Sequence, residues 1–336
     1  MRGFRTRTPG ARLGKEAEEV GRRAARPEPS EGPARVGPVN EAIGSALWRA
    51  LRPHQWAKNL LVFVPLALTP ALHGDLAKWL VLLAAFASWS AVASAGYLAN
   101  DRFDLAADRA DPAKRHRPFA SGALPVGVGV AAALALALSG LGLATAVAPL
   151  AFVAHLVAYL AATLAYSLWL KRMLLVDVLL LAAMYTLRLL AGGAATGIAL
   201  TPWLLGFSLF FFLGLAFAKR YAELARIGAS DAGNLSRRAY RSGDLDLLMM
   251  LGATSAYLSV LVFCLYINSD HVGRQYSRPD VLWLLAPILL YWESRIWFLA
   301  RRGELADDPV AFAVRDRVSY GLGALVALVL AVAIRG

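Results

Sequence analysis

Residues 76–109 read LAKWLVLLAAFASWSAVASAGYLANDRFDLAADR, a long apolar run that ends in a cluster of aspartates. Residues 76–99 carry a single charge, at Lys78, and a bilayer core ~30 Å thick needs roughly 20 apolar residues of helix. The stretch therefore predicts a transmembrane helix whose polar end lies at the membrane edge. Further apolar runs of this kind predict an all-α, polytopic bundle of nine transmembrane helices, near residues 57–73, 76–99, 125–145, 147–168, 173–193, 203–221, 246–268, 281–299 and 316–334.

The composition places the chain in lipid. Of 336 residues, 58% are hydrophobic and 17% are charged, with a mean hydropathy of +0.52, which is too apolar for one water-soluble core. A net charge of +12 would suggest nucleic acid as the partner of a soluble protein. Here the basic residues gather in loops between apolar runs, so we expect the lipid bilayer, and no nucleic acid, as the partner. The single cysteine, Cys264, lies in an apolar run, which excludes a disulfide framework and a thiolate metal site.

The basic residues also predict the orientation. They concentrate in alternate connections, at 100–122, 171–172, 219–242 and 301–317, and cytoplasmic loops carry the excess of Lys and Arg in membrane proteins. We therefore expect a multi-pass protein of the inner (cell) membrane whose active site faces the cytoplasm.

The N-terminal stretch differs from the rest of the chain. Residues 1–40 are rich in Arg, Pro, Gly and Glu and contain no apolar run. This composition predicts a disordered basic extension that precedes a transmembrane domain at 41–336.

The aspartate cluster indicates a metal site. Asn100, Asp104 and Asp108 are four residues apart, so on one continuous helix they project from nearly the same face. Hard oxygen ligands suit Mg²⁺, which is usually completed by waters and substrate phosphates. We predict Asn100, Asp104 and Asp108 as Mg²⁺ ligands at a solvent-facing membrane edge, with Asp101 and Asp104 in catalysis and Asn100 also contacting substrate. As an alternative, the alternation of Asp and Arg forms a solvated, salt-bridged helix end.

A basic loop follows the aspartates directly. Lys114, Arg115 and Arg117 lie there among Pro and Gly residues, and arginine forks and lysine point charges are the groups that bind phosphate. We predict that these three residues bind the diphosphate of a substrate. The alternative is a loop whose charges only set the topology.

Ionisable residues inside predicted spans are functional candidates. Asp177 and Arg188 are eleven residues apart in one span, which on a helix puts them about 20° apart in azimuth and ~16 Å apart along the axis. With Tyr185 nearby, they are predicted to line the bundle interior and to bind substrate. As an alternative, Asp177 pairs with Lys171 or Arg172 near the membrane edge.

The run from Asn100 to Asp108, followed by Arg-Pro at 117–118 and Ser-Gly at 121–122, resembles the first aspartate-rich motif of the UbiA prenyltransferase superfamily. The resemblance covers nearly the whole chain after about Trp48. It implies a nine-helix fold that binds magnesium diphosphate between two cytoplasmic motifs, over a lipid-facing cavity.

One departure from that family is informative. The second motif of the aromatic prenyltransferases, a pair of aspartates after the sixth span, is replaced here by KRYAEL at 219–224. Together with LRPHQWAKN at 51–59 and LRLLAGG at 187–193, this segment resembles the decaprenyl-phosphate phosphoribosyltransferase branch. That resemblance implies catalytic roles for Lys219 and Glu223, and it adds three substrate-binding residues, Lys58, Arg220 and Tyr221.

Members of that branch transfer 5-phosphoribose from phosphoribosyl diphosphate to a polyprenyl phosphate, for the synthesis of cell-envelope polysaccharide precursors. The implied substrates are those two compounds, and the implied cofactor is Mg²⁺. Two alternative functions remain. The protein could be a prenyltransferase that moves a polyprenyl group from its diphosphate to an aromatic or quinone-precursor ring, or a non-enzymatic lipid transporter. The sequence is also compatible with a homo-oligomer.

Overall fold

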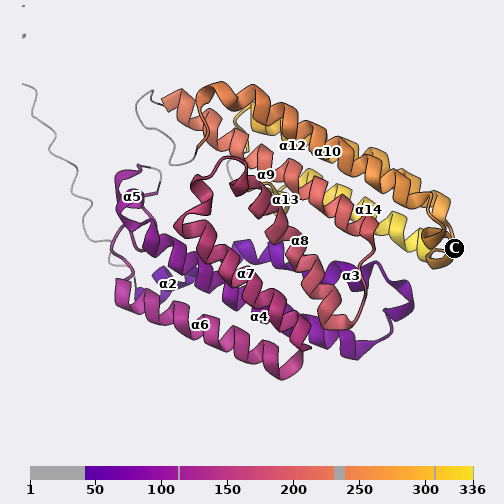
Figure 1. Cartoon of the computed structure of the whole chain (residues 1–336), viewed down its shortest axis with the longest axis horizontal. Helices are drawn as coiled ribbons and strands as arrows, with labels where there is room; N and C mark the ends of the chain where they lie inside the picture. Colours follow the sequence, from indigo (N-terminus) through magenta and orange to yellow (C-terminus); the bar gives the residue numbers. More distant parts are fainter. Residues whose placement is uncertain (1–41, 113, 231–238, 306–307, 336) are drawn as a thin grey trace, which may run out of the picture. The chain divides into compact units, whose positions relative to one another are not determined.

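The protein, seen here as a computed structural model, is described over residues 42–112, 114–230, 239–305 and 308–335 (Figure 1). The extension predicted at 1–40 lies outside the described residues. Within these ranges the chain forms helices and no strand, which confirms the all-α prediction. The elements are, in order, α2 (Ile43–Leu51), η1 (Pro53–Phe63), α3 (Val64–Ala67), η2 (Pro70–Leu72), α4 (Leu76–Phe103), α5 (Leu105–Ala110), α6 (Val126–Val147), α7 (Leu150–Leu168), η3 (Leu170–Arg172), α8 (Val176–Thr196), α9 (Pro202–Ser230), η4 (Ser242–Asp244), α10 (Leu245–Ile267), α11 (Asp270–Gln275), η5 (Pro279–Leu284), α12 (Leu285–Arg301), α13 (Pro309–Ala313) and α14 (Arg317–Arg335).

Among the described residues, eight helical stretches are long and apolar enough to cross a membrane. They correspond to the predicted spans from 76–99 onward. The closely spaced spans at 125–145 and 147–168 are two separate helices, α6 and α7, because the backbone turns at Ala148 and Pro149 caps the start of α7.

The first predicted span, 57–73, has a different form. The chain there passes through η1, α3 and η2 in series instead of one α-helix. Pro65 and Pro70 lack the N–H that a continuous helix would use, and their rings clash with the preceding turn. η1 is itself a 3-10 helix of 11 residues, whereas this form rarely runs beyond three or four. The described part of the bundle is therefore eight candidate spans plus this broken segment.

Helix α8 lies at the centre of the packing. It contacts α4, α7, α9 and η1, and its residues belong to both of the large hydrophobic clusters. Gly192 explains the contact with η1, because a Cβ atom at this position would lie 2.0 Å from the backbone oxygen of Val62. The missing side chain lets η1 lie directly on α8, and this brings Lys58 and Asn59 of η1 to the polar residues of α8.

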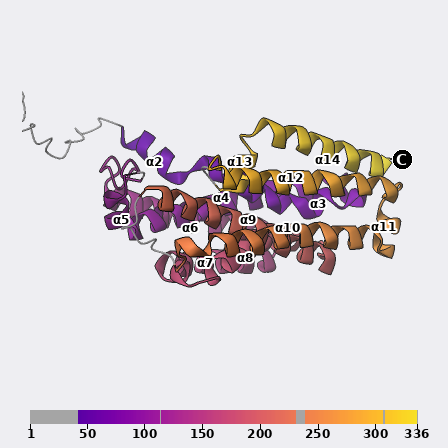
Figure 2. The ribbon, with the colours of Figure 1, turned by 90° about the horizontal axis from the view of Figure 1, so that it is seen from above.

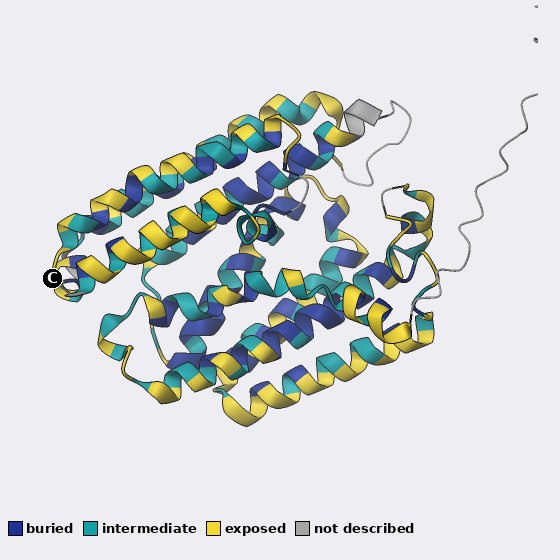
Figure 3. Cartoon of the chain, turned by 180° about the vertical axis from the view of Figure 1, so that it is seen from behind, coloured by how far each residue is buried: buried dark blue, intermediate teal, exposed yellow. Residues whose placement is uncertain are grey.

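Helices α6 and α14 present mostly exposed apolar surface, seen in yellow in Figure 3. Leu138 of α6 and Leu328 of α14 are among the most exposed large side chains. Helix α14 packs on α12 and η5, and Figure 2 shows it running alongside α12. Apolar faces of this kind are suited to contact with lipid tails, because the backbone polar groups between the helix ends are satisfied within the helix.

Candidate functional site

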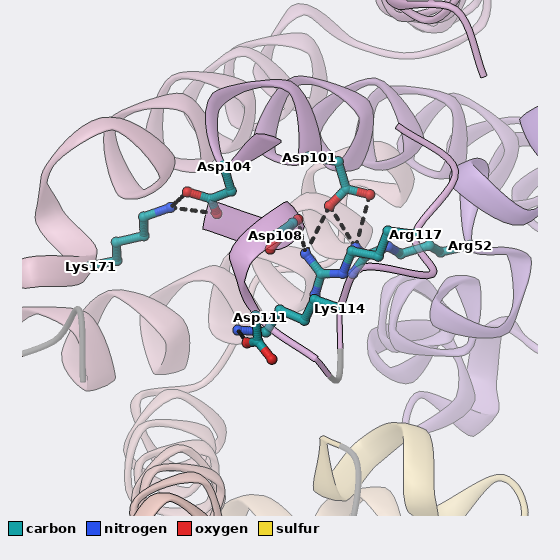
Figure 4. A network of polar contacts seen from close by, with 8 residues as sticks. All are labelled: Arg52, Asp101, Asp104, Asp108, Asp111, Lys114, Arg117 and Lys171. Carbon is teal, nitrogen blue, oxygen red and sulfur yellow. Dashed lines mark hydrogen bonds and ion pairs between the residues drawn. The ribbon is translucent and has the colours of Figure 1, made fainter. Parts of the chain in front are cut away.

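An outer cluster of ion pairs lies where α4 ends and α5 begins (Figure 4). Its cations come from three different segments: the end of α2, the loop after α5, and η3 between α7 and α8. Three formal positive charges meet three formal negative charges, so the cluster is neutral within itself. Its members are Asp101, Asp104, Asp108, Arg52, Arg117 and Lys171.

The helix that carries the aspartates is not continuous. The prediction that Asn100, Asp104 and Asp108 lie on one face of a single helix is therefore wrong. Helix α4 ends at Phe103 and α5 starts at Leu105, with Asp104 between them. Aspartate is unfavourable inside helices and favours their ends. At this break the Asp104 carboxylate reaches Lys171, while Asp108 turns toward Asp101.

Arg117 joins two of the carboxylates. Its Nη1 atom lies 2.8 Å from Oδ2 of Asp108 and 3.2 Å from Oδ1 of Asp101. Arg52 binds Asp101 from the other side through Nη2, at 2.7 and 3.0 Å. Lys171 binds Asp104 separately, with Nζ 2.7 Å from both carboxylate oxygens.

Burial is the second difference from the sequence-based expectation of a solvent-facing edge. The side chains of Asp101 and Asp108 are only 2% and 5% exposed. Burial raises the pKa of Asp108, although the charge of Arg117 opposes that shift. The helix end is therefore salt-bridged, but two of its carboxylates are buried and not solvated.

The other residues predicted at this end are not part of the outer cluster. Lys114 pairs with Asp111 on the surface, with Nζ 2.9 Å from Oδ2. Arg115 is exposed, and Asn100 lies half-buried in the last turn of α4. A groove of about 410 Å³ opens beside the cluster, lined by Phe103, Asp104, Ala106, Ala107 and Arg172.

The aspartates of the outer cluster offer limited evidence for a metal site. In the described residues, no three His, Cys, Asp or Glu side chains are grouped as a metal site. However, the carboxylates of Asp101 and Asp108 converge on one atom, Nη1 of Arg117, so a cation already occupies the point between them. Carboxylate oxygens are the ligands Mg²⁺ takes, and a metal would have to displace Arg117 to reach those of Asp101 and Asp108. The assignment of Asn100, Asp104 and Asp108 as ligands stays a prediction.

An inner cluster is centred on Asp308, a residue that the sequence analysis missed. Its carboxylate accepts from Nζ of Lys58 at 2.9 Å, from Nζ of Lys219 at 3.0 Å and from the hydroxyl of Tyr185 at 2.8 Å. The side chain is 8% exposed. Burial alone would raise the pKa of Asp308, but the two ammonium groups outweigh it and hold the pKa well below its usual range.

Arg188 lies next to the inner cluster, and no hydrogen bond described for it goes to a carboxylate. Its hydrogen bonds described in the structure go to neutral acceptors: Oδ1 of Asn59 at 3.0 Å, the hydroxyl of Tyr159 at 3.1 Å and the backbone oxygen of Met184. The guanidinium carbon also lies 4.7–5.8 Å from the ring centroids of Tyr159, Tyr185 and Trp89. Arg188 is a buried cation stabilised by dipoles and aromatic faces.

The inner cluster therefore carries a surplus of positive charge. Lys58, Lys219 and Arg188 contribute three formal positive charges, and Asp308 contributes one negative charge. The surplus of two within these four residues lies in the bundle interior, where uncompensated charge is costly, and the nearby carboxylate of Glu223 offsets only part of it. Such an arrangement is suited to an anion.

Asp177, Arg220 and Glu223 form a third group. Arg220 bonds to both carboxylates and donates to the hydroxyl of Tyr166 at 2.7 Å, and the hydroxyl of Tyr240 donates to Asp177 at 2.6 Å. Asp177 therefore does not pair with Lys171 or Arg172, because its partner comes from α9.

Most of the predicted residues belong to one of these three groups, whereas Asn100, Lys114, Arg115 and Tyr221 do not. Lys58, Tyr185, Arg188 and Lys219 meet in the inner cluster. Tyr221, in contrast, packs edge-on against Trp297, with ring centroids 6.0 Å apart. The sequence did contain a signal for Asp308, since Asp followed by Pro309 is typical of a helix start, and Asp308 indeed caps α13 by accepting from the N–H of Val310. Nothing local in the sequence pairs Arg52 with Asp101 or Lys171 with Asp104.

Known proteins resemble this chain over most of its length. Residues 60–317 match the UbiA prenyltransferase family. A protein of Sinorhizobium fredii designated y4nM is 38% identical over 281 residues, or 82% of this chain, and the chain spans about half, 54%, of that protein. The decaprenyl-phosphate phosphoribosyltransferase of Mycobacterium tuberculosis is 35% identical over 84% of this chain and 91% of its own length.

The fold also resembles a solved structure. A UbiA homolog from Archaeoglobus fulgidus bound to GPP and Mg²⁺ has a TM-score of 0.61 at 16% identity, covering 86% of this chain and 98% of that one. At this identity the likeness concerns the fold alone. The match over residues 60–317 shows that this chain belongs to the UbiA prenyltransferase family.

Proposed function

We propose that this protein is an integral membrane transferase that moves 5-phosphoribose from phosphoribosyl diphosphate to a polyprenyl phosphate. The relative that is 35% identical over 91% of its own length is named for such an activity, which supports the proposal. A role in making cell-envelope polysaccharide precursors follows from the same proposal.

The main structural support for this proposal is the surplus of positive charge in the inner cluster. A prenyl diphosphate brings one anionic group, whereas phosphoribosyl diphosphate and polyprenyl phosphate bring a diphosphate and two phosphomonoesters. A phosphomonoester carries about −1.5 to −2 charges near pH 7. One such group would neutralise the surplus left by Lys58, Lys219 and Arg188 around Asp308.

The outer cluster is the proposed site of the diphosphate. In the reaction, a phosphate oxygen of the lipid attacks C1 of the ribose, the bond from C1 to the diphosphate oxygen breaks, and diphosphate leaves with the bonding electrons. Lys114, Arg115 and Arg117 would neutralise the charge that develops on it. Mg²⁺ held by the aspartates, with Asn100, would stabilise the same charge as a Lewis acid.

The segment at 219–223 is proposed to bind the ribose and the 5-phosphate of the donor. Lys219 reaches the inner cluster, and Glu223 lies one turn further along α9, bound to Arg220. Within the proposal, Lys219 holds a phosphate and the Arg220–Glu223 pair lies at the ribose. The end of the bundle that carries the outer cluster would face the cytoplasm, because its loops carry the basic residues.

A prenyl donor fits the interior less well. Aromatic faces stabilise cations, and the rings of Trp89, Tyr159 and Tyr185 are candidates for stabilising an allylic cation. The guanidinium of Arg188 already lies over all three rings. A second positive charge at this place would be repelled.

Lys219→Ala tests the proposal. Loss of one charge-assisted hydrogen bond of ~1.5–3 kcal/mol corresponds to a roughly ten- to hundredfold higher KM for phosphoribosyl diphosphate. Asp308 keeps Lys58 as its partner in this variant, so the fold is expected to persist.

Inhibition by inorganic diphosphate is the control, because diphosphate has neither ribose nor a 5-phosphate. We expect the same inhibition constant in the variant and the parent. Equal weakening of donor binding and diphosphate inhibition would mean that Lys219 contacts the leaving group, and the case for a phosphoribosyl donor would then lose this support.

A further inference from the structure

Glu293 is a buried carboxyl group that belongs to neither the outer nor the inner cluster. It lies on α12 within the candidate span Pro279–Arg301, about 12 Å along the helix from Arg301. The residue is 1% exposed. Ionisable residues inside a membrane span are rare and costly, so each is a candidate for a function.

Glu293 has a single polar partner in the part of the chain that the structure describes. Its Oε1 atom lies 3.0 Å from Oγ of Ser259 on α10, whereas Oε2 has no hydrogen-bond partner among the described residues. An ionised carboxylate at this place would be a buried charge with one donor at most. Such a charge is strongly unfavourable unless it is paired.

The elements packed against α12 do not supply a cation for Glu293. These elements are α9, α10, α14 and η5, and neither α10 nor η5 contains Lys, Arg or His. Arg295 is turned about 200° around α12 from Glu293 and binds Asp316, which precedes α14. On α9, Lys219 and Arg220 bind carboxylates of the other clusters. Other ionisable groups of these elements bring no positive charge: Tyr257, Cys264, Asp280, Tyr291 and Tyr320.

The hydroxyl of Ser259 indicates which atom carries the proton. A serine hydroxyl has one proton to donate, yet Oγ of Ser259 lies 2.7 Å from the backbone oxygen of Ala256 and 3.0 Å from Oε1 of Glu293. A backbone oxygen can only accept. When the hydroxyl donates to Ala256, its contact with Glu293 is a hydrogen bond only if the carboxyl group donates, and this requires a protonated carboxyl. The remaining Oε2 is then a neutral carbonyl oxygen, which costs less to bury without a partner than a charged one.

We propose that Glu293 is a proton-binding site of the bundle: at neutral pH it is a carboxylic acid that donates its proton to Ser259, and this hydrogen bond joins α12 to α10. The bonds then run from Glu293 through Ser259 to the backbone of Ala256, with every donor used. Removal of the proton at alkaline pH leaves a buried charge and weakens the contact between the two helices. The proposal does not depend on which substrates the enzyme uses.

The pH dependence of the thermal unfolding midpoint tests the effect of the proton on the bundle. An unfolded, solvated glutamate is ionised at neutral pH, so a folded protein that keeps this proton binds one proton more than the unfolded chain. Stability then falls as the pH rises. We expect the midpoint of the parent to fall relative to that of Glu293→Gln from weakly acidic to alkaline pH, because glutamine keeps a donor for Ser259 and does not titrate. Parallel curves for the two proteins would contradict the proposal.

Ser294→Ala is the matched control for that measurement. The hydroxyl of Ser294 lies 3.1 Å from that of Tyr257, in an exposed contact between the same two helices. The substitution therefore removes a hydrogen bond between α12 and α10 without removing a carboxyl group. Its midpoint should follow that of the parent across the pH range, and a pH profile like that of Glu293→Gln would mean that the loss of any bond between these helices has this effect.

Infrared difference spectroscopy of the purified protein in detergent at neutral pH observes the proton directly. The spectrum of the parent minus that of Glu293→Gln should contain the C=O stretch of a protonated carboxylic acid. Carboxylate stretching bands in its place would overturn the proposal. Ser259→Ala keeps Glu293 and serves as the second variant if Glu293→Gln does not fold. In this variant the C=O band should move to higher frequency, because the acid loses its acceptor, and an unchanged band would contradict the bond to Ser259.

Discussion

Asp308→Ala is expected to lower the free energy of unfolding by about 3–5 kcal/mol, the effect of removing one partner from a buried ion pair. The variant leaves the ammonium groups of Lys58 and Lys219 close together in the interior without their shared counter-ion. It also removes the cap of α13 and the acceptor of the Tyr185 hydroxyl. The measurement is the thermal unfolding midpoint of the purified protein in one detergent.

A second substitution tests the electrostatic cause. Lys58→Met added to Asp308→Ala removes one of the two unpaired charges and should recover part of the lost stability. Asp246→Ala, at an exposed position on α10, should leave the midpoint nearly unchanged. If Asp308→Ala behaves like Asp246→Ala, then Asp308 is not the centre of the inner cluster.

Asp104→Ala should reduce the rate of transfer at least a hundredfold, since the loss of one group that stabilises developing charge costs about 10²–10³ in rate. The proposed role of Asp104 is to hold the metal that bears the leaving diphosphate. The Asp104 side chain is 19% exposed beside the groove, whereas that of Lys171 is 10% exposed and loses this partner in the variant. The stability of the variant should therefore fall, and the rates are compared at equal amounts of folded protein.

Asp111→Ala is the matched control for that rate. Asp111 lies in the same region and is 35% exposed, with its ion pair to Lys114 on the surface. Its removal should leave the rate near that of the parent. More than a tenth of the parental rate in Asp104→Ala would remove the first aspartate motif from the mechanism.

The helical spans were predictable because each depends on a local apolar run. Helices α4 and α6 to α10 lie close to their predicted ranges for this reason. The first span differs because Pro65 and Pro70 interrupt an apolar run whose composition alone indicates a helix. Asp177, Tyr185 and Arg188 were placed in the interior of α8 by helical periodicity, and all three side chains are buried there.

The geometry of the site was less predictable, because it depends on contacts between distant segments. The periodicity that places Asp104 and Asp108 on one face assumes an unbroken helix, and the break at Asp104 invalidates it. Asp308 lies 89 residues from Lys219 in sequence, so no local pattern connects them. Likewise, the partner of Asp177 is Arg220 on α9 and not the basic pair a few residues away.

The surplus of positive charge in the inner cluster and the neutrality of the outer cluster lead to one account of the substrates. The account assigns a metal-bound diphosphate to the outer cluster and a phosphomonoester to the inner cluster. A prenyl donor with an aromatic acceptor would leave the inner surplus uncompensated.

The most direct test of this account is to incubate the purified protein with Mg²⁺, phosphoribosyl diphosphate labelled in the ribose, and polyprenyl phosphate, and to measure label in the organic phase. A parallel reaction contains a labelled prenyl diphosphate and an aromatic acceptor. The account predicts lipid-bound label only when the ribose donor and the polyprenyl phosphate are both present, with no prenylated aromatic product. Label that stays in the aqueous phase while the aromatic acceptor is prenylated would contradict it.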